Sequence, residues 1–123
     1  MADQNPPDGL ADRGSNYWQA TTADYELSAS ELVILTEVCR TLDDLDRLAQ
    51  VIAHDGTTTL GSTGQTVVHP ALTEARGQRL ALHRLVSALA LPDVEGDTVP
   101  TTGTIRGKGA ARARWAGLTK RGA

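Results

Sequence analysis

The chain has 123 residues, of which 40% are hydrophobic, and a formal net charge of −3, so its length allows one modest domain with a small core. Its only cysteine, Cys39, excludes an intrachain disulfide and a cysteine-based zinc site. Met1 to Asp8 lacks the basic start and apolar run of a secretory signal, and no apolar run is long enough to cross a bilayer, so we expect a cytoplasmic protein with no membrane span.

Residues 1–14 are predicted to form a disordered N-terminal arm, because they are mostly polar and offer little to build a core. A helical oligomerisation core is expected over residues 15–92. At its start, Gly14 to Asp24 is predicted to form a short helix with Ser15 or Asn16 as N-cap. We interpret Trp18 as an anchor that pins this segment onto the long helices or onto a neighbouring subunit, in preference to a ligand contact.

A first long helix is predicted over residues 28–54. Ser28 and Glu31 have the spacing of a capping box, and Leu27 with Leu32 completes a hydrophobic staple. Apolar residues then recur every three or four positions, which predicts a helix with one apolar face. This face contains Leu32, Leu35, Val38, Leu42 and Leu45.

The apolar face of this helix is wider than one partner helix covers, because Ile34 and Cys39 lie beside it. Such a surplus predicts a second contact surface, supplied either by the N-terminal arm or by another subunit.

Residues 57–68 form a Gly/Thr-rich connector, in which β-branched residues on both sides of Gly61 to Gly64 predict a short hairpin. A second helix is predicted over residues 70–91, with Pro70 at its first position. Its apolar face includes Leu82, Val86 and Leu89. This helix also carries Arg76, Arg79 and Arg84 against one Glu, so we expect it to pair with the acidic first helix by charge as well as by apolar burial.

The chain divides into an acidic body and a basic end. Residues 1–97 hold all 15 acidic residues and 6 Arg, a net charge of −9, whereas residues 98–123 hold 6 cations and no acid, a net charge of +6. We therefore predict a linker and a flexible basic tail over residues 93–123. Three roles remain open for the tail: contact with a polyanion, docking on an acidic protein, or no specific role. Its cations are Arg106, Lys108, Arg112, Arg114, Lys120 and Arg121.

The sequence predicts no catalytic, metal or cofactor site. The histidines lack the spacing of metal ligands, and we interpret His69 as a helix cap or turn residue. Asp43, Asp44 and Asp46 do not face one point on a helix, so we interpret them as a solvated acidic face. Together these observations predict a mainly α fold, an antiparallel helical hairpin with a short β-like connector and flexible N- and C-terminal arms.

Several segments carry a family resemblance. They are Gly9 to Gly14 followed by Trp18, the acid-rich helix with Cys39 and Arg40, and His69 with Pro70 leading into an arginine-containing helix. In combination, over residues 9–95, they resemble the small terminase subunits of tailed bacteriophages, in particular the short P27-like group. The basic tail lies outside this resemblance.

The resemblance implies a non-enzymatic homo-oligomer, a ring, that recognises viral double-stranded DNA and presents it to the terminase large subunit, which holds the ATPase and nuclease. Such a protein is expected in the cytoplasm of the infected bacterial host and not in the mature virion. Several small terminases carry an N-terminal helix-turn-helix, but the 27 residues ahead of Ser28 are too few for its three-helix form.

DNA contact is therefore expected from the six tail cations, from Arg76, Arg79 and Arg84, or from the arm around Arg13. Oligomerisation is expected through the apolar faces of the two helices, that is Leu32, Leu35, Val38, Leu42, Leu45, Leu82, Val86 and Leu89. An alternative stays open, in which the protein is a pure protein–protein adaptor whose basic tail docks on the large subunit without direct DNA recognition.

Overall fold

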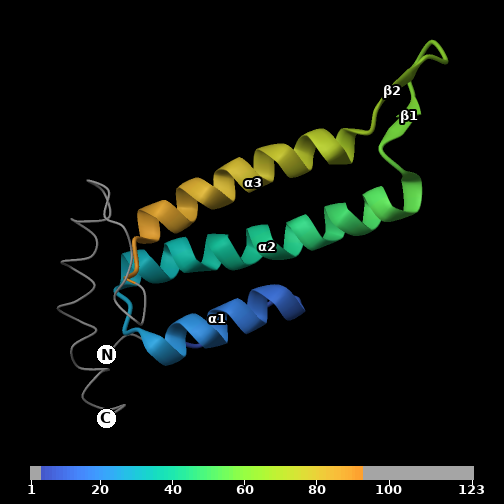
Figure 1. Ribbon diagram of the computed structural model, residues 1–123. Helices are drawn as coiled ribbons and strands as arrows, with labels where there is room; N and C mark the ends of the chain where they lie inside the picture. The colour runs from blue at the N-terminus through green and yellow to red at the C-terminus, as the bar shows by residue number, and fades with distance from the viewer. Residues whose placement is uncertain (1–3, 93–123) are drawn as a thin grey trace.

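The computed structural model describes residues 4–92, where two long antiparallel helices are joined by a small hairpin and flanked by a shorter helix (Figure 1). The elements, in chain order, are α1 (Asp12–Asp24), α2 (Ala29–Asp55), β1 (Thr58–Leu60), β2 (Thr66–Val68) and α3 (Pro70–Leu89). The predicted mainly α class with a short β-like connector is confirmed. All predictions for residues 93–123 lie outside the described residues.

The capping box predicted at the start of α2 is present. Ser28 Oγ accepts a hydrogen bond from the Glu31 backbone N–H over 3.2 Å, and the Glu31 carboxylate accepts one from the Ser28 N–H over 2.9 Å. Two of the otherwise unpaired donors of the first turn are thereby satisfied. At the other end, Gly56 adopts φ +84°, a conformation that favours glycine. Both ends of α2 are therefore specified locally.

The connector forms the predicted antiparallel hairpin. Thr58 pairs with Val68 and Leu60 pairs with Thr66, and the turn is closed by a hydrogen bond from the Gly64 N–H to the Gly61 carbonyl over 3.0 Å. Figure 1 shows that this hairpin projects beyond the shared end of α2 and α3, away from α1.

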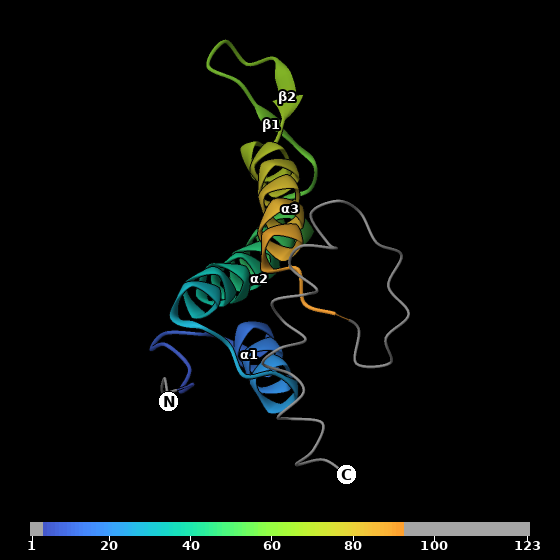
Figure 2. The same ribbon diagram turned by 90° about the vertical axis from the view of Figure 1, so that its left-hand side faces the viewer.

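Helix α2 is the centre of the fold, because α1 and α3 both pack against it. The view along the helices in Figure 2 places α2 between the other two, with α1 and α3 diverging from it. Helix α1 runs beside the half of α2 nearest its N-terminus (Figure 1), so the half that carries the hairpin consists of α2 and α3 alone.

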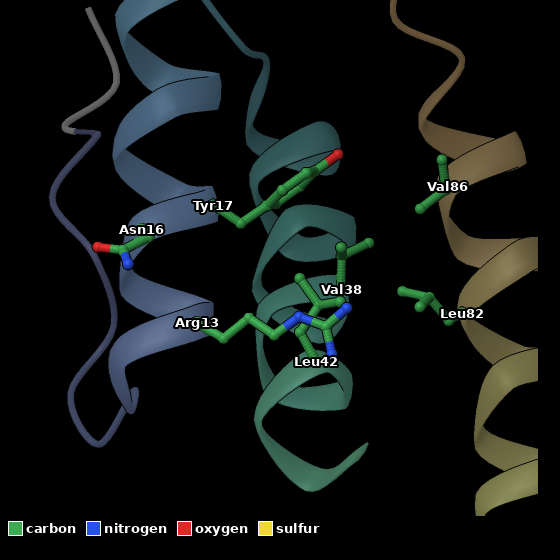
Figure 3. A pocket seen from close by; sticks show the side chains of 7 residues that line it. All are labelled: Arg13, Asn16, Tyr17, Val38, Leu42, Leu82 and Val86. Atoms are coloured by element: carbon green, nitrogen blue, oxygen red, sulfur yellow. The ribbon is translucent and has the colours of Figure 1, made fainter. Parts of the chain in front are cut away.

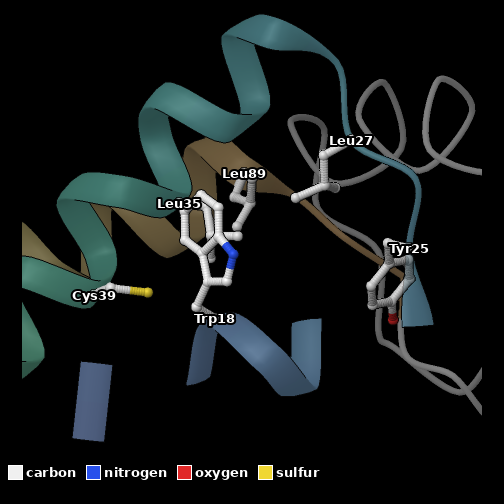
Figure 4. Close-up of a cluster of buried hydrophobic side chains, with 6 residues drawn as sticks. All are labelled: Trp18, Tyr25, Leu27, Leu35, Cys39 and Leu89. Carbon is white, nitrogen blue, oxygen red and sulfur yellow. The ribbon is translucent and has the colours of Figure 1, made fainter. Parts of the chain in front are cut away.

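The core lies where α1, the start of α2 and the end of α3 meet (Figure 4). Trp18 is 3% exposed and packs in one cluster with buried residues of all three segments. The prediction that Trp18 anchors its segment onto the long helices is thus confirmed. The other buried members of the cluster are Tyr25, Leu27, Leu35, Cys39 and Leu89.

The N-terminal segment is more ordered than the sequence predicts. Residues 4–14 were expected to be disordered, yet Gln4 is tied to the turn between α1 and α2: its side-chain oxygen accepts from the Leu27 N–H over 2.8 Å, and its backbone carbonyl accepts from Trp18 Nε1 over 2.9 Å. The prediction of a disordered arm over residues 1–14 is therefore wrong from Gln4 onward. Its polar side chain finds partners in backbone groups that only the fold brings near.

Helix α1 begins at Asp12, earlier than predicted, and neither Ser15 nor Asn16 caps it. Instead the Asp43 carboxylate, on α2, accepts hydrogen bonds from the backbone N–H groups of Ala11 and Gly14, each over 2.7 Å. Asp43 is 2% exposed, so its assignment to a solvated acidic face is wrong. A carboxylate at a helix N-terminus is favoured by the unpaired donors and by the helix dipole.

This cap requires a close approach of α1 to α2, and Gly14 permits it. A Cβ atom at Gly14 would lie 2.4 Å from Asp43 Oδ2 and 2.7 Å from the Cys39 backbone oxygen. Both separations are well below ordinary contact distances. Any larger residue must push α1 away from α2 and lengthen the Asp43 hydrogen bonds.

We predict that Gly14→Ala destabilises the protein by about 1–3 kcal/mol, the usual cost of overpacking. The matched control is Gly77→Ala in α3, where an added Cβ meets no atom within 4 Å. Because alanine is the better helix former, the control is expected to stabilise by about 0.5–1 kcal/mol. Urea unfolding followed by circular dichroism measures both, and equal effects of the two substitutions would contradict the close approach.

Candidate functional site

The arginines of the described residues fall into two groups. Those of α1 and α2 each pair with a carboxylate, whereas Arg76, Arg79 and Arg84 of α3 are exposed and form no ion pair with another described residue. The ion pairs are Arg13 with Asp46 at 3.0 Å, Arg40 with Glu37 at 3.2 Å, and Arg47 with Asp44 at 2.7 Å. The three guanidinium groups of α3 therefore remain available to bind a group outside the described residues.

The sequence-based expectation that α3 pairs with α2 through these arginines is wrong. At 100° per residue, Arg76, Arg79 and Arg84 spread over an arc of about 140° around α3, and they span about 12 Å of helix axis. The buried residues Ala71, Ala75 and Leu89 lie roughly opposite Arg84, whereas Arg79 is only about 40° from Ala75. Apolar burial alone therefore sets which face of α3 meets α2.

A groove of about 440 Å³ runs between α1 and α3, over the surface of α2. Figure 3 shows Tyr17 on the α1 side, Leu82 and Val86 on the α3 side, and Val38 with Leu42 on α2 between them. Arg13 and Asn16 of α1 complete the lining. The open apolar surface of the groove belongs to its walls, because Val38 and Leu42 on the floor are at most 7% exposed whereas Val86 is 43% exposed.

The residues predicted for oligomerisation are mostly used inside one chain. Leu35, Val38, Leu42, Leu45 and Leu89 are each at most 8% exposed, so in this conformation they offer little surface to another subunit. Leu35 and Leu89 pack in one cluster with Trp18 of α1, so the N-terminal segment is one of the surfaces that cover the surplus apolar face of α2.

Three members of the predicted oligomerisation set keep some exposure. Leu32 is half-buried and packs against the core cluster, and Leu82 is half-buried in the groove wall. Val86, also in the groove wall, is 43% exposed. Among the residues predicted for oligomerisation, Leu82 and Val86 in the groove wall therefore still offer apolar surface to a partner.

A hydrogen-bonded network links the two ends of the hairpin. The Asp55 carboxylate contacts His54 Nδ1 over 2.7 Å and His69 Nε2 over 3.0 Å. His69 Nδ1 accepts from the Ala71 N–H over 3.0 Å, which confirms the interpretation of His69 as a helix cap. Since Nδ1 accepts, Nε2 carries the proton that is donated to Asp55. Hydrogen bonds from His54 and then from His69 lower the pKa of Asp55 below its ordinary value of 3.8.

The remaining reactive group of the described chain is Cys39, which is buried. Burial, and secondly the nearby Asp43 carboxylate, raise the pKa of the Cys39 thiol to about 11, so it stays protonated near neutral pH and is a poor nucleophile. Within residues 4–92, no three His, Cys, Asp or Glu side chains are placed to hold a metal ion. None of the helices there is long and apolar enough to cross a membrane.

Sequence reasoning missed the groove and the role of Asp43 for different reasons. The helical spacing of Leu82 and Val86 places them on one apolar face, but it does not show that α1 leaves this face uncovered. The pairing of Asp43 with Gly14 joins residues 29 positions apart, so local periodicity contains no signal for it. The predicted tail cations lie outside the described residues.

No family model, curated protein or solved structure matches this chain.

We predict that Asp55→Asn weakens the link between the hairpin ends in a pH-dependent way. Because the folded-state pKa of Asp55 is lowered, the carboxylate stabilises the fold above its ordinary pKa, and this contribution is lost as pH falls through the lowered value. The free energy of unfolding should therefore differ most between wild type and variant near neutral pH and converge in acid. Urea unfolding at several pH values measures this.

His69→Asn provides the control for Asp55→Asn, because asparagine keeps a capping side chain but is too short to reach Asp55. In the His69→Asn background, Asp55→Asn is expected to have a smaller effect. A pH-independent difference between wild type and Asp55→Asn would contradict the role given to the carboxylate.

Proposed function

We propose that this protein is a small terminase subunit, a non-catalytic oligomeric adaptor that recognises DNA for a viral genome-packaging motor and presents it to the large subunit. The observation that carries the proposal is the division among the arginines. Every arginine of α1 and α2 has a carboxylate partner, and every arginine of α3 lacks one within the described residues. The family resemblance over residues 9–95 supports the same role.

Unpaired arginines on one helix face are suited to phosphate. The planar guanidinium donates two parallel hydrogen bonds to phosphate oxygens, and it remains charged at every physiological pH. An arginine that already holds a carboxylate must give up that partner before it can do the same. The arginines of α3 incur no such cost.

The charge of the rest of the chain restricts where DNA can approach. Residues 4–69 hold 10 acidic residues and 3 Arg, a net charge of −7, whereas residues 70–92 hold 1 Glu and 3 Arg, a net charge of +2. A polyanion is repelled by the first part and attracted by the second. The α3 side is therefore the expected DNA-facing surface of the described body, with the tail cations as a second source of contacts.

A non-catalytic role agrees with the use of the reactive groups. His69 caps α3 and contacts Asp55, which also contacts His54, and Cys39 is a buried, protonated thiol. Each of these groups has a structural role that explains it. The chemistry of packaging is accordingly assigned to the large subunit.

A second candidate function is the pure protein–protein adaptor, favoured by the acid surplus of the described body. Residues 4–92 hold 11 acidic residues against 6 Arg, a net charge of −5, which opposes DNA binding over most of the surface. In this case the basic tail docks on an acidic face of the large subunit, and the α3 arginines contribute to protein contact.

We predict that Arg76→Gln, Arg79→Gln and Arg84→Gln, combined in the full chain, weaken binding to duplex DNA and reduce the slope of log K against log salt by about 2–3, because up to three phosphate contacts are lost. Fluorescence anisotropy between 50 and 200 mM salt measures the slope.

The matched control combines Arg13→Gln, Arg40→Gln and Arg47→Gln, which removes the same charge from arginines that already have partners. Its DNA affinity is expected to fall less and its salt slope to stay near that of wild type. An equal loss of DNA affinity in the two triple variants would mean that the loss depends only on net charge, and it would contradict a DNA-binding site on α3.

Replacing the six tail cations by Gln distinguishes the two functions. If the protein is a DNA-recognition adaptor, the variant should bind DNA more weakly and with a smaller salt slope. Unchanged DNA binding together with lost stimulation of the large-subunit ATPase would support the protein–protein adaptor instead. Stimulation equal to that of wild type would exclude docking through the tail.

A further inference from the structure

The β1–β2 hairpin presents apolar side chains to solvent. Leu60 is 72% exposed and Val68 is 52% exposed. Because Leu60 pairs with Thr66 and Val68 pairs with Thr58, both apolar side chains lie on the same face of the hairpin, in diagonal positions. Residues 57–68 carry no charged side chain. A two-stranded hairpin of this size gains little stability alone, so a covering surface would be favourable.

The groove between α1 and α3 is the matching recess. Its walls are formed by Tyr17, Leu82 and Val86, and its volume of about 440 Å³ lies in the range of pockets that enclose a ligand. Its one charged lining residue, Arg13, is already paired with Asp46. An uncharged apolar insert therefore suits this groove better than a charged one.

The hairpin of a chain cannot reach the groove of the same chain. Leu42 at the groove and Asp55 at the hairpin base are 13 residues apart on one continuous helix, a separation of about 20 Å. Figure 1 shows the hairpin pointing away from α1, which forms the other groove wall. A hairpin that enters this groove must therefore belong to a second copy.

The charge distribution favours a head-to-tail arrangement of copies. A two-fold contact through α3 would oppose Arg76, Arg79 and Arg84 to themselves, which costs free energy. In a head-to-tail contact between the hairpin and the groove no like charges are opposed, because residues 57–68 are uncharged and Arg13 of the groove is paired with Asp46. Different surfaces on the two partners make the contact heterologous, and such contacts form a ring when the rotation closes.

We propose that the hairpin of one copy inserts Leu60 and Val68 into the α1–α3 groove of the next copy, against Tyr17, Leu82 and Val86. The inference rests on the proposed function only for the existence of an oligomer, and it names the two surfaces that form it. DNA binding is not required for this contact.

The test uses Leu60→Asp and Val86→Asp in the full chain, analysed by native mass spectrometry. Both side chains are exposed in one chain, so the folded monomer should persist, which circular dichroism checks. Each variant alone is expected to be monomeric. Mixed together, they should form a one-to-one dimer, because the first retains an intact groove and the second an intact hairpin. The matched control is Leu80→Asp, 53% exposed on α3 but turned about 120° from Val86, which should assemble as wild type does.

Each result has one meaning. A monomeric wild type would contradict both this contact and the oligomer of the proposed function. An oligomeric wild type that is unaffected by Leu60→Asp and Val86→Asp would contradict this contact alone. Dissociation by Val86→Asp but not by Leu60→Asp would assign the groove to another segment, such as the C-terminal tail, and would overturn the hairpin assignment. Failure of the mixture to form dimers, or dissociation of Leu80→Asp, would also overturn it.

Discussion

The Asp43 carboxylate, which accepts hydrogen bonds from the backbone N–H groups of Ala11 and Gly14, holds α1 in its position. A buried charge needs such partners, because an unpaired carboxylate away from water costs several kcal/mol. The arrangement is mutual: Asp43 gains these two donors only when α1 is docked, and the N–H groups of Ala11 and Gly14 gain their acceptor from Asp43. Trp18 then adds apolar burial along the same helix.

The position of α1 decides which apolar surface is left for partners. Helix α1 covers one side of α2 and α3 covers another, and the two diverge. The core residues Leu35 and Cys39 are thereby enclosed within one chain. The apolar surface that stays open includes the groove between α1 and α3 and the exposed hairpin at the far end. A body of this size buries only a modest part of its surface, so covering both features through association would add stability that the single chain lacks.

Charge is divided along the same lines as packing. The arginines of α1 and α2 pair with carboxylates of the same two helices, whereas those of α3 form no ion pair with a described acid. An adaptor that contacts both DNA and copies of itself needs such separate surfaces, since phosphate binding requires accessible cations and subunit contact requires apolar area. Helix α3 turns Arg84 about 160° away from Val86, whereas Arg79 lies about 20° from Val86.

The sequence by itself determined the features that depend on near neighbours. The capping box of Ser28 and Glu31, the stop at Gly56, the hairpin turn and the cap at His69 are all built from residues a few positions apart, so local patterns were sufficient to predict them. The tertiary structure decided what joins distant residues: the use of Asp43 as the cap of α1, the order of the segment from Gln4, the burial of leucines predicted for oligomerisation, and the unpaired arginines of α3. Periodicity identifies an apolar or charged face, but it does not say which segment covers it, because that choice depends on contacts across tens of residues.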